Sequence, residues 1–504
     1  MQILSPALIF LVPALPLLAG IICRLVSTPN AAKVAKAAAA CSLALAAVLV
    51  FFGADGWNGW VEFDLAGRVM LLLVAFLGAV IIRFSHHYLH GDPAQNRFFS
   101  WMSLTLASVL TMVVAGHTVV FLITWVAMSQ FLHRLLLHRP ERAGAVFSAR
   151  KKYVFSRLGD LCLLAAVLWL GQGHGAWTMD QVAQLAQSGA EVGWTGVGLL
   201  LALCAILKSA QFPFHTWLPD TMETPTPVSA FMHAGIINAG GFLVIRFSPV
   251  FDSSFAGAYS LVVIGTLSAA FGAIVMLAQP SVKRALAYST IAQMGFMLLQ
   301  CGLGAYGLAL IHIVAHSLYK AHAFLTAGST IGAMPRASIA LKYSTLAFGV
   351  LVGVGMVIVG NTLLHALLPE MAEQAPVFSV VLAFSLAYGV ARSTSSQAGF
   401  QIFGRVLGMA VLVTLISMIL HATAGWMALD QGAAHLPNWL VIAVSAIFVG
   451  LFLFQAMHWR AHRFPLGRAL YVHSLNGFYM GTLGNRLLSN LWPRHKVLNP
   501  PADS

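Results

Sequence analysis

Long apolar segments recur along almost the whole chain, separated by short polar segments. Most have about 17–25 residues, the length that a helix needs to cross the hydrocarbon core of a bilayer. The pattern predicts an all-α polytopic membrane protein with about fifteen transmembrane helices. The predicted spans are 3–23, 37–53, 66–84, 98–115, 118–137, 153–171, 193–211, 228–247, 258–278, 285–302, 304–333, 343–366, 376–393, 406–424 and 438–457.

Charged residues divide the connecting loops into two sets that alternate along the chain. One set, with the C-terminal segment, holds all of the 28 lysines and arginines except Arg68, Arg246, Lys208 and Lys320. Because cytoplasmic loops are rich in lysine and arginine, we predict an N-terminus outside and a C-terminus in the cytoplasm. The first apolar run, 3–23, has no cationic start, so we expect it to remain as a helix.

Composition supports a membrane location and limits the other function classes. Hydrophobic residues make up 59% of the chain and charged residues 9%. The net charge of +13 follows from the basic cytoplasmic loops, so it does not indicate a nucleic-acid partner. The five cysteines fall in or beside apolar runs, as small buried hydrophobes do. No CxxC, HExxH or Walker motif is present, so we expect no metal, cofactor or catalytic site in this chain.

Lys208 stands out because it lies inside a predicted span. A lysine at the bilayer centre costs about 2.5–3.5 kcal/mol on insertion scales, so such a residue normally faces the protein interior or water. Lys208 precedes the segment "QFPFHTWLP", whose prolines cannot continue a regular helix. A desolvated lysine releases its proton more readily, which favours a role in proton transfer. The alternative is a lysine that snorkels or is permanently paired, for example with Glu223.

A second group of ionisable residues lies in the segment "IHIVAHSLYKAHAFLTAGS". His312, His316 and Lys320 are spaced by four residues, so they lie on one helix face and can pass protons along it. His233 is a candidate link between Lys208 and this row. The same spacing suits a metal site, but no acid or cysteine is close in the sequence. The alternative is that the histidines only satisfy buried carbonyl groups.

Two further features have mainly structural interpretations. Asp160 and Arg157 are three residues apart in one predicted span, which favours an ion pair on one helix face. The segment 458–504 mixes arginine, histidine and aromatic residues on a helical period. It predicts an amphipathic basic helix that lies at the membrane surface or docks a cytoplasmic partner. A basic tail held by anionic lipid is the alternative.

These motifs resemble those of the antiporter-like membrane subunits of complex I and of Mrp cation/proton antiporters. The resemblance rests on "KSAQFPFHTWLPDTMETPTPVSAFMHA", "SVKRALAYSTIAQMGFM" and "HSLYKAHAFLTAGSTI", and covers about residues 100–335. It implies inverted five-helix repeats with broken helices and a proton path through Lys208, His312, His316 and Lys320. The expected organisation is N-terminal helices 1–97, repeats 98–247 and 258–424 (the second degenerate), a last span 425–457 and the tail 458–504.

The sequence also departs from the family pattern. Trp125 is followed by Val126, where the family has a glutamate that tunes the central lysine. The span 343–366 lacks the family's exit lysine and has only His365 at its end, and we expect no long lateral helix after the last span. A relay that lacks these groups is similar to the membrane subunit of the DAB inorganic-carbon accumulation complexes.

That resemblance implies a bacterial inner-membrane subunit that couples an ion gradient to CO2 hydration or bicarbonate accumulation. It implies a large cytoplasmic zinc partner resembling a carbonic anhydrase, docked by the cytoplasmic loops and the tail, with the zinc in that partner. The alternatives are a proton-pumping subunit of a complex I-like or hydrogenase complex and an Mrp-type antiporter subunit. Charge partners of Lys208 would be Glu223, Asp160 or Arg157.

Overall fold

The computed structural model describes residues 6–53, 56–57, 59–330, 341–367, 376–395, 436–461 and 464–491, and isolated residues between 404 and 423. Apart from the antiparallel strand pair β1 (Gly56–Trp57) and β2 (Glu62–Phe63), every secondary-structure element that it describes is a helix. The predicted all-α class is therefore confirmed for the described residues. Only part of the span predicted at 406–424 is described, namely residues 408, 411–416, 418, 419, 422 and 423, and residues 492–504 of the predicted tail lie outside the described residues.

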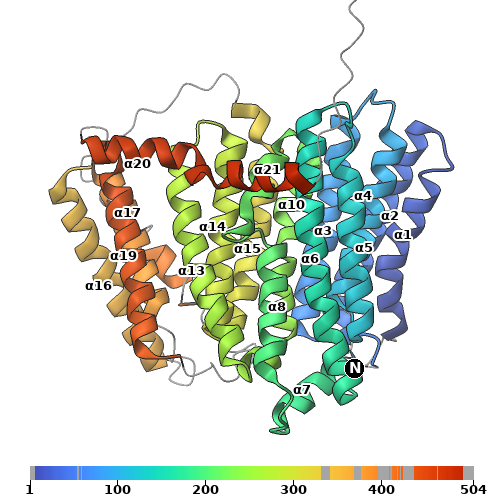
Figure 1. Ribbon diagram of the computed structural model, residues 1–504, viewed down its shortest axis with the longest axis horizontal. Helices are drawn as coiled ribbons and strands as arrows, with labels where there is room; N and C mark the ends of the chain where they lie inside the picture. The colour runs from blue at the N-terminus through green and yellow to red at the C-terminus, as the bar shows by residue number, and fades with distance from the viewer. Residues whose placement is uncertain are drawn as a thin grey trace, which may run out of the picture.

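The helices stand side by side as one elongated bundle (Figure 1). The helices of its first half are η1 (Pro6–Phe10), α1 (Leu11–Ile22), α2 (Thr28–Phe52), α3 (Leu65–Tyr88), α4 (Gln95–Val113), α5 (Thr118–Leu136), α6 (Ala143–His174), α7 (Met179–Gln187), α8 (Trp194–Lys208), η2 (Phe214–Thr216), α9 (Trp217–Asp220), η3 (Thr221–Glu223), α10 (Thr226–Ala234), η4 (Ile236–Asn238), α11 (Ala239–Arg246) and α12 (Ser248–Asp252). Those of its second half are α13 (Phe255–Ala278), α14 (Val282–Gly302), α15 (Tyr306–Leu325), η5 (Ala327–Thr330), α16 (Tyr343–Leu367), α17 (Pro376–Ser395), α19 (Asn438–Ala461), α20 (Pro465–Leu475), η7 (Gly477–Tyr479) and α21 (Met480–Leu491).

The described helices match the pattern of apolar segments. Nine of them are long and apolar enough to cross a membrane, and three shorter apolar helices cover Leu8–Ile22, Trp194–Lys208 and Pro376–Arg392. The outer faces carry large apolar side chains, such as Leu161 and Ile123, each 60% exposed. Exposed apolar surface of this extent suits a lipid environment and not water.

Two consecutive spans are interrupted at mid-length. The helix α8 ends at Lys208, where Ala210 has a positive φ of 52° and the backbone N–H of Gln211 donates to the carbonyl of Ile206 at 3.0 Å. The next span is broken at Gly235, between α10 and α11. In the second predicted repeat, by contrast, α16 runs through 25 residues without a break. The described breaks therefore fall around the candidate lysine and histidines.

The start of α6 differs from the predicted start of the span at residue 153. The helix begins at Ala143, so Lys151 and Lys152 lie within it and are only 1% and 3% exposed. The positive charges favoured a loop here, because cations cluster in cytoplasmic loops. The side chains instead have buried partners: Lys152 Nζ donates to the carbonyl and the hydroxyl of Ser129, both at 2.8 Å.

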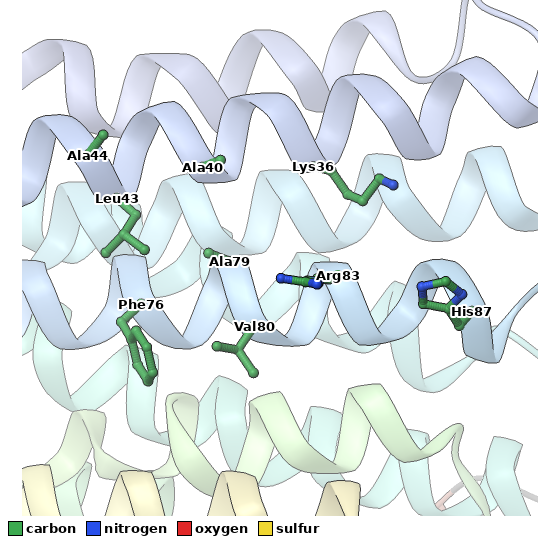
Figure 2. A pocket seen from close by; sticks show the side chains of 9 residues that line it. All are labelled: Lys36, Ala40, Leu43, Ala44, Phe76, Ala79, Val80, Arg83 and His87. Atoms are coloured by element: carbon green, nitrogen blue, oxygen red, sulfur yellow. The ribbon is translucent and has the colours of Figure 1, made fainter.

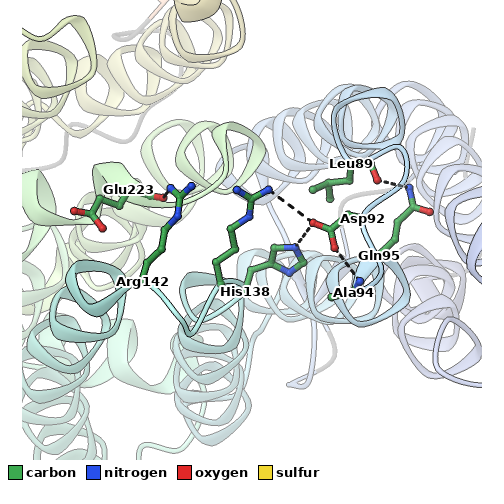
Figure 3. A network of polar contacts seen from close by, with 8 residues as sticks. Leu89, Asp92, Ala94, Gln95, His138, Arg142 and Glu223 are labelled. Carbon is green, nitrogen blue, oxygen red and sulfur yellow. Dashed lines mark hydrogen bonds and ion pairs between the residues drawn. The ribbon is translucent and has the colours of Figure 1, made fainter. Parts of the chain in front are cut away.

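The basic end of the bundle is held by a polar network (Figure 3). Asp92, in the α3–α4 loop, contacts His138 at 3.1 Å and accepts from the backbone N–H of Ala94 at 2.8 Å. Burial raises the pKa of Asp92, but the hydrogen bonds from Ala94 and His138 and the charge of Arg139 outweigh it and hold the pKa below its ordinary value. The network thus joins the α3–α4 loop to the end of α5.

The opposite end contains a buried arginine with two acidic partners. Arg246, at the end of α11, has a side chain only 2% exposed, and its Nη1 lies 3.0 Å from both Glu62 Oε1 and Asp64 Oδ1. Its Nη2 donates to the carbonyl of Val113 at 2.8 Å. This group ties the end of the broken second span to the loop that precedes α3.

We expect Arg246→Ala to destabilise the protein by about 3 kcal/mol, because removing one partner leaves two carboxylates without a counter-charge at a partly buried site. Thermal unfolding of the purified protein in detergent measures the effect. The variant Glu62→Gln/Asp64→Asn/Arg246→Met removes all of the charges and should recover most of the loss. An equal loss in both variants would show that packing, and not charge pairing, accounts for the effect.

Candidate functional site

Lys208 lies at the last position of α8, in the middle of the bundle. It is 6% exposed, and its Nζ lies 4.4 Å from the centre of the Trp125 ring on α5. Its Nζ has no hydrogen-bond partner in the part of the chain that the structure describes. A cation over an indole face gains about 2 kcal/mol or more when water is excluded. The ring of Trp125 is thus the direct contact of this ammonium group.

The helix α6 supplies the charges around Lys208. Arg157 and Asp160 form an ion pair, with Nη2 and Oδ2 at 2.5 Å, although the angle is not that of a hydrogen bond. Both charges, and that of Lys152, act electrostatically on Lys208. The carboxylate that the sequence lacks after Trp125 on α5 therefore has a counterpart on the neighbouring helix α6.

Glu223 lies elsewhere. Its carboxylate is against Gly144 at the start of α6, and its backbone carbonyl accepts from Arg142 at 3.5 Å (Figure 3). It is not among the charges that act on Lys208. The predicted pairing of Lys208 with Glu223 is therefore absent, because the segment after the break carries Glu223 to the basic end of the bundle.

His233, in α10, is fully buried beside the second break. Its Nδ1 is 3.1 Å from the hydroxyl of Thr290, and its ring stacks on Phe324 with the centres 4.4 Å apart. Its Nε2 has no partner among the described residues. Because Phe324 belongs to α15, this stacking places His233 directly against the helix that carries the second group.

The structure places His233 next to the predicted row of His312, His316 and Lys320 on α15. The rings of His312 and His316 are 6.1 Å apart, and the backbone of His233 and the charge of Lys320 act on His316. Lys320 is fully buried and its Nζ donates to the carbonyl of Leu286 at 2.9 Å. His233, His316 and Lys320 thus form one buried cluster between α10, α14 and α15.

Polar side chains at the two breaks lie between Lys208 and this cluster. Ser209 Oγ donates to the carbonyl of Ile237 at 2.9 Å, which joins the first break to the second. Asn238 Nδ2 donates to Ser317 Oγ at 2.8 Å, which joins the second break to α15. Asn238 Oδ1 and Gln211 Oε1 are buried without partners among the described residues. The region therefore offers several polar atoms that can each accept a hydrogen bond.

His312 lies at the other end of the row, next to a cavity. Its Nδ1 is 2.8 Å from Gln300 Oε1 and its Nε2 is 3.0 Å from Gln293 Oε1. Gln293 also lines a cavity of about 520 Å³ together with Ser385, Tyr388 and Gln455. Sequence reasoning missed the two glutamines, although they are seven residues apart in an apolar run and so share a helix face.

The C-terminal helices α20 and α21 form an arm that lies across the helix ends (Figure 1). Gln279 Nε2 donates to the carbonyl of Leu475 at 3.2 Å, and Phe478 packs against Phe271. Lys151 Nζ donates to Asn485 Oδ1 at 2.8 Å and lies 2.9 Å from Asp220 Oδ2. These two short helices lie within the segment 458–504, for which the sequence predicts a helix; no long lateral helix is present among the described residues.

Two family models match the chain. The model described as NADH:quinone oxidoreductase/Mrp antiporter, TM, matches residues 115–372, and the complex I chain 5 N-terminus model matches residues 61–99. A solved Mrp complex from Dietzia sp. superposes with a TM-score of 0.66 at 21% identity, over 97% of this chain and 60% of that chain. At this identity the superposition shows a shared fold. The chain spans less than two thirds of that subunit.

Curated relatives match over most of the length. The "Probable inorganic carbon transporter subunit DabB" of Hydrogenovibrio crunogenus is 34% identical over 470 residues, covering 88% of this chain and 87% of the relative. The "Probable inorganic carbon transporter subunit DabB2" of Halothiobacillus neapolitanus is 36% identical over 451 residues, covering 86% of this chain and 81% of the relative. The NADH-quinone oxidoreductase subunit L of Mycobacterium tuberculosis is 36% identical over 279 residues, covering 54% and 44%.

We expect Asn485→Ala to loosen α21, because Lys151 then loses its hydrogen-bond partner on the arm. A hydrogen bond to a charged group contributes about 1.5–3 kcal/mol, so amide hydrogen exchange in α21 should accelerate about 10-fold or more. Asn476→Ala is the matched control, since the Asn476 side chain donates only within its own helix, to the carbonyl of Val472. Equal exchange in the two variants would show that the Lys151 contact does not hold the arm.

Proposed function

The chain belongs to the antiporter-like family of membrane subunits that includes those of complex I and Mrp, and from this premise we propose that it is the proton-conducting subunit of an inorganic-carbon transporter. As a multi-pass membrane protein of this family it is a cation-translocating subunit. The finer assignment is supported by the full-length similarity to subunits named DabB.

One observation carries the proposal: two buried lysines and two buried histidines of the described residues gather around the two helix breaks. Lys208, His233, His316 and Lys320 lie on α8, α10 and α15. The helix α16 has no lysine or carboxylate, and its His365 is exposed. A proton path whose ionisable residues lie on α8, α10 and α15 but not on α16 suits a subunit that delivers protons to a partner. It suits a self-contained antiporter less well.

The chemistry of the stations favours protons over sodium ions. Amines and imidazoles gain and lose protons, whereas hard metal cations prefer oxygen ligands. Water molecules that bridge Lys208 Nζ, Asn238 Oδ1 and His316 Nε2 would satisfy these buried atoms and complete a path along the two helix breaks. In this proposal Lys208 is the entry station, His233 and His316 are the middle stations, and His312 opens toward the cavity at Gln293.

We further propose a large cytoplasmic partner with a zinc site like that of a carbonic anhydrase, which hydrates CO2 as protons pass. In this proposal the zinc belongs to the partner, as the similarity to the DAB complexes implies. The basic loops and the arm formed by α20 and α21 offer the docking surface. Lys151, which the arm contacts, lies beside Asp220, just after the break at Lys208.

The alternatives differ in what accompanies the chain. The similarity to NADH-quinone oxidoreductase subunit L favours a redox-driven pump, and the Mrp superposition favours a cation/proton antiporter. Purification of the intact assembly separates the three: a zinc protein supports the inorganic-carbon transporter, iron–sulfur absorbance supports a redox pump, and several small membrane subunits support an antiporter.

Lys208→Ala should abolish inorganic-carbon accumulation while the protein still inserts, because the change removes a charge that is costly to bury. Lys208→Arg should fail as well, since a guanidinium group keeps its proton. Growth of a host that needs high CO2 measures the effect in air, with Lys342→Ala, an exposed cation, as the control. Wild-type growth of either Lys208 variant would exclude Lys208 from the mechanism.

A protonophore such as CCCP should collapse inorganic-carbon uptake in cells that express this protein with its partner, even when fermentation maintains ATP. One charge that crosses 100 mV releases about 2.3 kcal/mol, which supports roughly a 40–50-fold accumulation. A His316→Ala variant should lower uptake at an unchanged gradient. Uptake that follows the ATP level, or that survives complete uncoupling, would contradict a proton-driven transporter.

A further inference from the structure

A groove lies between α2 and α3, away from the buried lysine and histidine stations (Figure 2). It has a volume of about 700 Å³, within the range of about 300–1,000 Å³ that is typical of small-molecule sites. Lys36, Arg83 and His87 line one end, and Leu43, Phe76 and Val80 line the rest. The groove is therefore amphipathic along its length, with a cationic end and an apolar end.

The cationic end has no acidic partner among the described residues. Lys36 Nζ lies 3.3 Å from His86 Nδ1, a contact between two basic groups. The charges that act on His86 are Lys36, His87, His90 and Lys33, all of them basic. The nearest acid along the chain, Asp92, is already held by His138 and Arg139. Lys36 donates this hydrogen bond, so it still has no counter-charge here, and a bound anion would supply one to Lys36 and to Arg83.

The groove as a whole has about the length of one membrane leaflet. Phe76 and His87 are eleven residues apart on α3, which corresponds to about 16 Å at 1.5 Å per residue. This is about half of the roughly 30 Å hydrocarbon core. Ala40, Ala44 and Ala79 line the floor, and their small side chains leave the groove open. The groove thus extends from the basic end of the bundle to about the middle of the bilayer.

We propose that this groove binds one anionic glycerophospholipid of the cytoplasmic leaflet. Its phosphate lies between Lys36, Arg83 and His87, and one acyl chain lies along Leu43, Phe76 and Val80. Basic pockets between membrane helices on the cytoplasmic side recognise anionic headgroups in this way. A soluble phosphate would leave the apolar part of the groove unfilled, and a zwitterionic headgroup would bring a second cation to an end that already carries several.

Native mass spectrometry of the detergent-solubilised chain with its partner tests the site, with phosphatidylglycerol and phosphatidylcholine as probes. We expect phosphatidylglycerol to be retained preferentially. Each basic residue near an anionic surface contributes about 1 kcal/mol, or about 5-fold, so Lys36→Gln/Arg83→Gln should weaken its retention about 25-fold. The pair Arg284→Gln/Lys342→Gln removes two exposed cations outside the groove and should leave retention unchanged.

A second variant tests the apolar part. Ala79→Phe keeps every cation but fills the floor of the groove, so it should also reduce phosphatidylglycerol retention. Equal retention of both lipids by the wild type would overturn the proposal. So would unchanged retention in Lys36→Gln/Arg83→Gln, or displacement of the lipid by inorganic phosphate, which would indicate a site for a free anion.

Discussion

The burial of one ammonium group shapes the centre of this bundle. An isolated lysine in the middle of a membrane helix is costly, and Lys208 has no hydrogen bond to offset that cost among the described residues. Its charge is met instead by the ring of Trp125 and by the carboxylate of Asp160 on the adjacent helix. Asp160 is itself shared with Arg157, so it does not fix Lys208 in the charged form as a dedicated partner would. A lysine held this loosely suits a group that must release its proton.

The helix break beside Lys208 sets a second requirement. The backbone N–H and C=O groups that it frees must find partners inside the protein. Broken helices at membrane depth persist only where other groups satisfy the freed backbone atoms. Here Gln211 Nε2 donates to the carbonyl of Ser209 at 2.7 Å, and Ser268 Oγ accepts from the backbone N–H of Phe212 at 3.0 Å. Ser209 in turn satisfies a carbonyl at the second break. The hydrogen bond of Ser209 thus satisfies the backbone and joins the two breaks at the same time.

Much of this arrangement could be predicted from the sequence, because the bilayer imposes a length on every apolar segment and the prolines after Lys208 cannot continue a regular helix. The spacing of Arg157 and Asp160 was enough to predict their ion pair. Lys151 and Lys152 were assigned to a loop because of their positive charges, and the groups that accept their hydrogen bonds, Asp220 and Ser129, are too distant in the sequence to be recognised there. The pairing of Glu223 with Lys208 is absent for a similar reason. The short helices η2, α9 and η3 after the break change the direction of the chain, and the hydrophobic periodicity of the sequence does not predict that direction.

The arm formed by α20 and α21 connects two regions that are distant in the sequence, the C-terminal end of the chain and the helix α6. It extends from the last helix, at the far end of the bundle, back to α6, where Asn485 contacts Lys151. Lys151 also pairs with Asp220, in the short helix α9 that follows the break at Lys208. A protein bound to the arm would therefore lie one ion pair away from the segment that ends the lysine-bearing helix. In the proposed function this contact would couple the membrane path to the reaction of the partner, because Lys208, His233, His316 and Lys320 are themselves buried.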